Sequence, residues 1–291
     1  MKIDRIFLFA VVFGIVAAPI WAVDFKPDPA FEPGFSVYDT VADVVVQPDG
    51  KLLVAGCQTN NGPCAPYFKR LNFDGTVDST FNAPLNPIST GGGFVASINP
   101  LPNGQYLITG NFQIGTARTN YARVNGDGSI DTTLVPGFIA NHVGAMTVAP
   151  LPDGKFVMCM DRTINGENYK MAHRINSDGS PDPTFRIVFM DGFCTDLEGL
   201  PDGKLLISVR VNGTTSQPPV KPIHRLNADG SKDMTFDVDL PVGSYANGLT
   251  RMPDGKLLVL AGRDGQNNRP VKRLLPDGAV DLTIPLCSGQ T

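Results

Sequence analysis

The chain has 291 residues and a formal net charge of −4 at pH 7. A protein that binds a phosphate backbone needs a basic face, so this acidic balance argues against a nucleic-acid-binding protein. No stretch after residue 22 is long and apolar enough to cross a membrane, which argues against a membrane-spanning protein.

The first 22 residues are predicted to be a cleaved signal peptide. Lys2 and Arg5 give a basic start, residues 6–18 form an apolar run without charge, and Ala22 offers a small residue at the cleavage point. The apolar run is too short for a membrane anchor. We therefore expect a secreted or periplasmic protein whose mature part, residues 23–291, is a single domain.

Five cysteines in an exported chain predict one or two disulfides. Cys57 and Cys64 flank a turn-forming loop and are the candidate disulfide, which would contribute about 2.5 kcal/mol in the chain-entropy model. Cys159 and Cys194 stand at similar heights in successive repeats, and they either pair or fill gaps as buried thiols. Cys287 is then unpaired.

A Pro-Asp-Gly-Lys turn recurs about every fifty residues, a spacing typical of repeat proteins built from small sheets. Proline and glycine supply the backbone angles that close a hairpin. Each turn precedes an apolar run without alternation, such as residues 52–54, which indicates a strand covered on both faces. The turns begin at Pro48, Pro102, Pro152, Pro201 and Pro253, and the second departs from the pattern at Asn103 and Gln105.

A second marker follows each turn and reads Arg-φ-Asn-x-Asp-Gly-x-x-Asp-x-Thr-Phe, where φ is apolar. Its Asp-Gly pair indicates another hairpin, so each unit is expected to have four strands. Four-stranded sheets repeated radially predict an all-β fold, a β-propeller of about five four-stranded antiparallel blades. A β-solenoid is the alternative, although its coils usually repeat over a shorter period. The expected repeats cover residues 36–86, 87–139, 140–190, 191–241 and 242–286.

A half-marker stands before the first repeat, where Asp28 and Phe31 have the spacing of the Asp-x-Thr-Phe end. Propellers commonly close their ring by pairing a strand from one terminus with the blade at the other, and residues 28–31 are the candidate for that strand. The last repeat carries its own version of the motif, at residues 281–284. Five closed blades and an open array both remain compatible with this pattern.

The two markers together resemble the delta-60 repeat, a bacterial repeat family thought to form β-propellers. The likeness is strongest at residues 174–185, at residues 225–236 and in the Leu-Pro-Asp-Gly-Lys turns, and it covers about residues 28–284. It implies a propeller fold and export, and it supplies no catalytic residues to transfer. The last repeat departs from the family pattern at Leu275 and Ile284.

The most regular charges are an arginine and an aspartate eight residues apart in every repeat. A strand–turn–strand hairpin would bring the two side chains together, which predicts a structural ion pair inside each blade. Because each arginine has its own aspartate, a ring of anion-binding arginines is less favoured. The pairs are Arg70–Asp78, Arg123–Asp131, Arg174–Asp182, Arg225–Asp233 and Arg273–Asp281.

Two metal-site interpretations are weaker than their structural alternatives. The Asn72 to Asp78 segment resembles part of a calcium loop, but Arg70 and Phe81 stand where two calcium ligands belong. A tight turn is therefore favoured. His173 and His224 occupy a position that is lysine or alanine in other repeats, which indicates a solvated strand face. No cofactor signal is present.

Three acidic residues could serve hydrolysis at the mouth of a central channel. Asp43 and Asp196 stand at equivalent places in the innermost strands, and Glu198 is near the second of them. Glycoside chemistry uses two carboxylates roughly 5–10 Å apart. A glycosidase-like or lactonase-like hydrolase is thus the runner-up interpretation.

The preferred interpretation is a non-catalytic exported scaffold that binds an unknown macromolecule or surface. Strand parity places both regular turns on one side of the disc and the irregular loops on the other side. Loops carried by a rigid scaffold are where binding usually occurs, although these could be mere connectors. A third interpretation is a repeat fragment of a larger surface assembly. The loops between second and third strands cover residues 57–66, 111–120, 161–168, 211–221 and 263–270.

Overall fold

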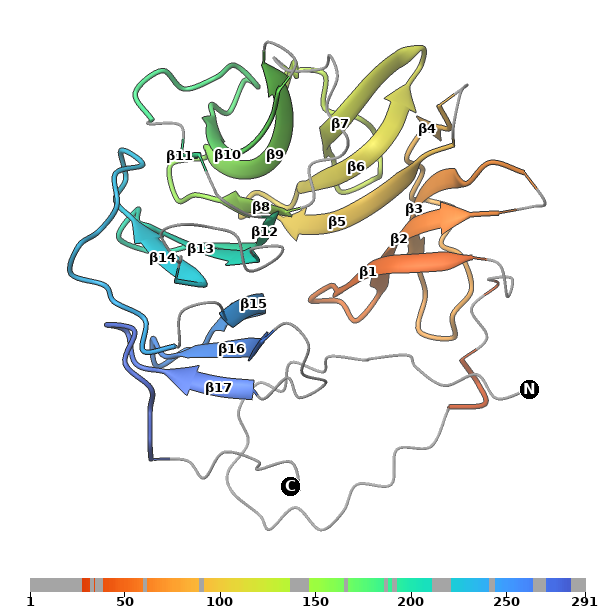
Figure 1. Ribbon diagram of the computed structural model, residues 1–291. Helices are drawn as coiled ribbons and strands as arrows, with labels where there is room; N and C mark the ends of the chain where they lie inside the picture. Colours follow the sequence, from red (N-terminus) through yellow and green to blue (C-terminus); the bar gives the residue numbers. More distant parts are fainter. Residues whose placement is uncertain are drawn as a thin grey trace.

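The computed structural model describes residues 28–31, 34, 39–59, 62–88, 92–136, 147–164, 167–185, 188–189, 193–210, 221–240, 244–263 and 271–283. Every regular element within those ranges is a β-strand. The strands form five antiparallel sheets of three or four strands, which we call blades 1 to 5 in chain order (Figure 1). The predicted signal peptide and Cys287 lie outside these ranges, and the domain and repeat limits remain predictions.

The strands of each blade follow one another in the chain. Blade 1 contains β1 (Thr40–Val46), β2 (Leu52–Gln58) and β3 (Ala65–Leu71). Blade 2 contains β4 (Leu85–Asn86), β5 (Phe94–Pro100), β6 (Tyr106–Ile114) and β7 (Ala117–Val124). Blade 3 contains β8 (Thr147–Pro150), β9 (Phe156–Ile164), β10 (Glu167–Ile175) and β11 (Val188–Phe189). Blade 4 contains β12 (Phe193–Gly199), β13 (Leu205–Arg210) and β14 (Ile223–Leu226). Blade 5 contains β15 (Ser244–Arg251), β16 (Leu257–Arg263) and β17 (Val271–Leu274).

The Pro-Asp-Gly-Lys turns join the first two long strands of each blade. In blade 1, Gly50 N donates to Gln47 O at 2.8 Å, and Gln47 N donates to Lys51 O at 2.8 Å. Gly50 has a φ of 82°, which side chains with a Cβ rarely adopt. The sequence therefore places these hairpins correctly because the turn chemistry is local.

The Asp-x-Thr-Phe segment, expected to be the fourth strand, is a turn in every blade. In blade 1 it follows a single bridge between Leu71 and Val77. Asp78 then closes the turn, because its Oδ1 accepts hydrogen bonds from Thr80 N and Thr80 Oγ1 at 2.9 and 2.6 Å. The two additional strands are each two residues long. β4 precedes the other strands of blade 2 and pairs with β6, whereas β11 follows the turn of blade 3 and pairs with β10.

Neighbouring blades pack through the phenylalanine or leucine that ends each Asp-x-Thr-Phe turn. Phe81 of blade 1 lies in one apolar cluster with Tyr106, Ile108 and Val124 of blade 2. The residue after it, Asn82, donates its backbone N–H to Asp127 O in the Asn-x-Asp-Gly turn of blade 2 at 3.0 Å. The turns of blades 1 to 4 thus each belong to one blade and pack on the next.

The glycine of the Asn-x-Asp-Gly turn is required at this contact. Val135, which follows Leu134 of blade 2, donates its N–H to Asp178 O of blade 3 at 2.9 Å. A Cβ on the adjacent Gly179 would lie 2.1 Å from Val135 O. Gly179 also has a φ of 91°, so both space and backbone conformation favour glycine there.

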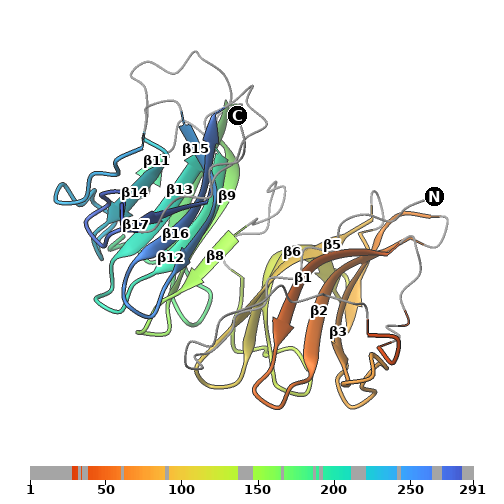
Figure 2. The ribbon, with the colours of Figure 1, turned by 90° about the horizontal axis from the view of Figure 1, so that it is seen from below.

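The five blades follow one another in an arc whose inner edge is formed by β1, β5, β8, β12 and β15 (Figure 1). Viewed from below, blades 1 and 2 lie on one side and blades 3 to 5 on the other, with β5 beside β8 (Figure 2). Successive blades pack on one another throughout. No comparable contact joins the described strands of blade 5 to those of blade 1, so the described blades do not form a closed ring.

Candidate functional site

Asp78 is the centre of a buried ion cluster in blade 1. Its Oδ2 accepts hydrogen bonds from Lys51 Nζ at 2.6 Å and from Arg70 Nε at 2.8 Å. Only 6% of the Asp78 side chain is exposed. The hydrogen bonds from Lys51 and then from Thr80 hold the pKa of Asp78 well below its usual range. The carboxylate is therefore a fixed anion between two cations.

The same cluster recurs in all five blades, so each expected arginine lies beside its own aspartate. The aspartate side chains are no more than 12% exposed. Four arginines use Nε toward Oδ2, whereas the fifth uses Nη2. The Nε distances are 2.8 Å for Arg70–Asp78, 2.7 Å for Arg123–Asp131, 2.8 Å for Arg174–Asp182 and 2.7 Å for Arg225–Asp233, and the Nη2 distance is 2.7 Å for Arg273–Asp281.

The lysine of the first turn is a member of this cluster that the sequence analysis missed. Lys155, Lys204 and Lys256 reach their aspartates as Lys51 does. In blade 2 the equivalent Gln105 donates to Asp131 at 2.8 Å instead. The signal was available, because lysine recurs at this position in four of the five turns.

Each arginine of blades 1 to 4 also reaches the next blade. Its Nη1 donates to a backbone carbonyl in the Asn-x-Asp-Gly turn of that blade, more than fifty residues along the chain. The guanidinium groups of Arg70, Arg174 and Arg225 also lie over the phenylalanine rings of their own blades, at 4.9–5.1 Å. The acceptors are Gly126 O for Arg70 at 2.9 Å, Ser177 O for Arg123 at 2.8 Å, Ala228 O for Arg174, and Pro276 O for Arg225 at 2.8 Å.

The two inner-strand aspartates bind backbone amides of the following blade. Asp43 Oδ2 accepts from Ile98 N at 2.8 Å, and Asp196 Oδ2 accepts from Leu249 N at 2.8 Å. The pairing of β5 with β6 is irregular between Val95 and Ser97, just before Ile98, and the pairing of β15 with β16 is irregular between Ala246 and Leu249. Burial raises the pKa of Asp43 and of Asp196, and these hydrogen bonds oppose the rise. Both carboxylates therefore hold neighbouring blades together.

Glu198 lies on β12 two residues after Asp196 and is half-buried. Burial raises the pKa of Glu198, the charge of Asp196 adds to this rise, and the charge of Arg251 opposes it. Asp43 belongs to blade 1, whereas Asp196 and Glu198 belong to blade 4. Of the three candidate carboxylates, Asp196 and Glu198 are thus the two that the structure brings together.

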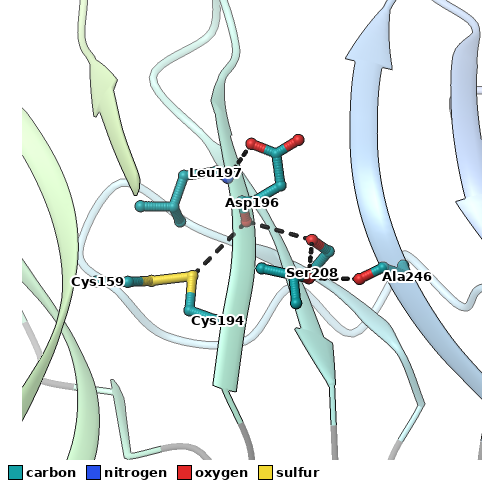
Figure 3. Close-up of a disulfide and its surroundings, with 7 residues drawn as sticks. Cys159, Cys194, Asp196, Leu197, Ser208 and Ala246 are labelled. Atoms are coloured by element: carbon teal, nitrogen blue, oxygen red, sulfur yellow. Dashed lines mark hydrogen bonds between the residues drawn. A yellow bond between two sulfur atoms is a disulfide. The ribbon is translucent and has the colours of Figure 1, made fainter. Parts of the chain in front are cut away.

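Two disulfides tie the chain. Cys57 and Cys64 are joined, with Cα atoms 5.5 Å apart, across the tip of the β2–β3 hairpin. Cys159 of β9 and Cys194 of β12 are joined across the junction of blades 3 and 4, with Cα atoms 6.0 Å apart (Figure 3). The second bond settles the alternative between a pair and two buried thiols.

Polar side chains beside the second disulfide continue the link toward blade 5. Thr195 Oγ1 lies 2.8 Å from Ser208 Oγ, and it donates to Ala246 O on β15. The sequence analysis missed this contact, since a threonine and a serine carry no repeated pattern.

The structure gives different results for the candidate calcium loop and for the two histidines. The residues of the candidate calcium loop bind one another, because Thr76 N donates to Asp74 Oδ1 at 2.9 Å and Asn72 Nδ2 donates to Thr76 Oγ1 at 3.0 Å. Within the described ranges, no three His, Cys, Asp or Glu side chains gather as a metal site would require. His173 is only 4% exposed, so the expectation of a solvated face was wrong there. Burial lowers the pKa of His224, and the charge of Lys232 lowers it further.

A comparison with protein families identifies the repeats. The profile described as "Domain of unknown function (DUF5122) beta-propeller" matches residues 47–81, 101–134, 151–185, 200–236 and 253–283, together more than half of the chain. The chain belongs to the DUF5122 β-propeller family. The match confirms a propeller repeat family with five repeats, and the delta-60 name remains an expectation.

Solved structures similar to this DUF5122 protein are enzymes of several kinds. They include a gluconolactonase from Xanthomonas campestris, with 14% identity over 76% of this chain and 69% of that one, at a TM-score of 0.45. A quinoprotein alcohol dehydrogenase-like protein from Bacteroides thetaiotaomicron has 11% identity over 85% of this chain and 66% of that one, at a TM-score of 0.42. A puromycin hydrolase has 15% identity over 86% of this chain and 49% of the hydrolase chain, at a TM-score of 0.42. No curated protein matches the chain. These likenesses carry no argument about activity.

The five segments that match the family exclude the inner strands. Each matched segment begins just after an inner strand and ends at an Asp-x-Thr-Phe turn. The ion clusters therefore lie inside the DUF5122 repeat. Asp43, Asp196 and Glu198 lie outside it, so family membership says nothing of these three carboxylates. No helix in the described part of the chain could span a membrane.

Proposed function

We propose that this DUF5122 propeller is an exported, non-catalytic scaffold that binds a macromolecule or surface through its variable loops. The observation that carries the proposal is the hydrogen bonding of Asp43 and Asp196. Each directs one carboxylate oxygen to a backbone N–H of the next blade. A carboxylate held in that way stabilises the contact between two blades, whereas a hydrolase would need the same carboxylate for catalysis.

The variable loops support binding because they differ while the turns at the other ends of the strands repeat. The 111–120 segment forms a long hairpin in which Arg118 Nε donates to Asn111 Oδ1 at 3.1 Å. The 57–66 loop of blade 1 is closed by a disulfide instead. Parts of every variable loop except 111–120 lie outside the described residues. Different loops on equivalent blades suit recognition of an irregular partner.

Export is supported by the two disulfides, since such bonds persist in oxidising compartments. The basic and apolar start of the sequence points the same way. The delta-60 resemblance, which implies export, is part of this proposal.

A propeller hydrolase is the second candidate, and Glu198 is the observation that favours it. A half-buried carboxyl with a raised pKa beside another carboxyl is typical of a general acid. Asp196 is its neighbour, and Arg251 supplies a nearby positive charge.

Two matched substitutions separate the candidates. We expect Asp196→Asn to lower the melting temperature and Glu198→Gln to leave it nearly unchanged, and we expect neither variant nor the parent to hydrolyse aryl glycosides or lactones. Hydrolysis by the parent that Glu198→Gln abolishes, without a change in melting temperature, would establish the hydrolase. The binding role is tested by measuring how much of the protein is retained on envelope fractions of the producing cell. Replacement of residues 114–117 by a two-residue Asn-Gly turn should reduce the retained amount, whereas the turn variant Asn103→Asp should leave it unchanged.

A further inference from the structure

Every junction between successive blades buries one apolar residue from each side. The first blade contributes the second residue of its post-turn strand, and the second blade contributes the residue that follows the Asp43-equivalent position on its inner strand. We call these surfaces the donor face and the acceptor face. Both residues fall in the same apolar cluster at each junction. The pairs are Leu53 with Ile98, Leu107 with Val148, Val157 with Leu197, and Leu206 with Leu249.

The donor face of blade 5 is uncovered. Leu258 is the residue equivalent to Leu53, Leu107, Val157 and Leu206, which are no more than 2% exposed. Leu258 itself is 37% exposed. Blade 5 thus presents an apolar position that the other four blades bury against a neighbour.

The arginine of blade 5 lacks the contact that the other four arginines make. Arg273 Nη2 donates to Thr283 Oγ1 at 2.8 Å, as its equivalents do. Among the described residues, no carbonyl of a following blade accepts a hydrogen bond from Nη1, and this is the contact that a docked turn would supply.

The acceptor face of blade 1 is uncovered in the same way. Its Val44 is equivalent to Ile98, Val148, Leu197 and Leu249, which are 4–5% exposed. Val44 is 42% exposed. The carbonyl equivalent to Gly126 O, which Arg70 binds in blade 2, belongs to Phe73, a residue that is 72% exposed.

We propose that the donor face of blade 5 binds the acceptor face of blade 1 in a second copy of this chain. The four junctions inside the chain show what covers a donor face, namely the acceptor face of another blade of the same repeat. Blade 1 carries such a face, with Val44 as the partner of Leu258 and Phe73 O as the acceptor for Arg273. Since these two faces lie apart within one chain, the contact is made between chains, head to tail (Figure 1).

The N-terminal half-marker occupies part of the acceptor face. Phe31 packs against Leu52, Val54 and Leu71, as Phe81 packs against Tyr106, Ile108 and Val124. Its turn has the same two bonds from backbone donors, because Ala30 N donates to Asp28 Oδ1 at 2.9 Å and Phe31 N donates to Asp28 O at 3.2 Å. The chain therefore carries one more such turn than it has blades to receive them. Blade 5 of a second copy has to compete with residues 28–31 for this position.

The test compares single variants with their mixture, using the full chain purified under oxidising conditions. Leu258→Asp damages only the donor face and Val44→Asp only the acceptor face, and Met234→Asp, at a site 80% exposed in blade 4, is the matched control. Sedimentation velocity is measured from about 1 to 100 µM, a range in which a weak interface becomes populated. Circular dichroism and melting temperature verify that each variant is folded.

We expect the parent and Met234→Asp to associate as concentration rises, and each end-face variant to associate at least about 100-fold more weakly because it buries an unpaired charge. An equimolar mixture of Leu258→Asp and Val44→Asp should form dimers and nothing larger, since one intact donor face and one intact acceptor face remain. A parent that stays monomeric throughout, or a mixture that stays monomeric while the parent associates, would overturn the proposal.

Discussion

The blades are tied to one another in two regions that differ in regularity. At the turn end, the same cluster of arginine, aspartate and lysine or glutamine recurs in every blade, and four arginines reach a carbonyl of the next blade. Along the inner strands, the ties differ between junctions. Asp43 joins blades 1 and 2, a disulfide joins blades 3 and 4, and Asp196 joins blades 4 and 5.

This difference separates the contacts that belong to the repeat itself from those that are particular to one junction between blades. A contact encoded in the repeat has to work at every junction, so its residues cannot vary independently. An inner-strand tie concerns a single pair of blades, and its chemistry is free to be a carboxylate or a disulfide. Variants of the turn end should therefore resemble one another, whereas inner-strand variants should not.

Acid should break the regular region as a whole. The five cluster aspartates have lowered pKa values, so their stabilisation is present above the unfolded pKa of about 3.9 and is lost as the pH falls below it. Asp43, Asp196 and Glu198 have raised pKa values, so their contribution is present at low pH and is lost as the pH rises through the folded pKa. The melting temperature should therefore rise slightly as the pH first falls from 7, and then fall steeply below pH 4. Calorimetry that finds a continued rise to pH 2 would contradict the assignment.

Loss of the disulfide between blades 3 and 4 should be the largest effect of a change along the inner strands. Its cysteines are 35 residues apart, against 7 for Cys57 and Cys64. The chain-entropy model gives about 4 kcal/mol for the longer loop and about 2.5 kcal/mol for the shorter one. Urea unfolding of the two double Cys→Ala variants measures both values. Equal losses would indicate that strain or residual structure, rather than loop length, decides the effect.

Arg174→Ala should lower the melting temperature by about 6 °C, since Lys155 still neutralises Asp182 while the guanidinium contacts are lost. Arg273→Ala should have a smaller effect because that arginine has no carbonyl of a following blade. Differential scanning calorimetry of the two variants isolates the contact between blades. The comparison fails if both lower the melting temperature equally at concentrations where the parent is monomeric.

The smallest expected effect is a gain. Gln105→Lys would give blade 2 the cation that the other clusters contain, beside an Asp131 side chain that is 12% exposed. The bond from Gln105 to Asn125 Oδ1 at 2.8 Å would be lost. We expect the melting temperature to rise by about 2 °C, as for other partly exposed ion pairs. A fall would mean that the link to Asn125 is the more important one.

The sequence predicted the features that depend on neighbours in the chain. Pro-Asp-Gly-Lys encodes its own hairpin, and an eight-residue spacing across a hairpin brings Arg70 to Asp78. The fourth strand was wrong for a local reason as well. Asp78 and Thr80 satisfy each other within the turn, and the strand pattern does not register such side-chain bonds.

Contacts between blades could not be predicted in the same way. Arg70 reaches Gly126 O, a backbone atom that any residue supplies, so no side-chain pattern marks the acceptor. Asp43 and Asp196 were correctly placed on inner strands, but their partners are the backbone amides of Ile98 and Leu249. The open arc was also beyond reach, because it depends on how far each junction rotates one blade from the next.

The glycine at each Asn-x-Asp-Gly turn has a genetic consequence. Gly128 of blade 2 leaves space for the backbone of Asn82 of blade 1, and blade 2 also carries Val135, whose backbone fills the space beside Gly179 of blade 3. Each repeat is therefore self-complementary, and tandem duplication of the coding segment creates a working junction without further mutation. A chain with a second copy of residues 191–241 inserted after residue 241 should fold with six blades and melt near the parental temperature; a lower, broader transition would count against this. A lineage of such proteins can thus change length by whole repeats while every intermediate remains folded.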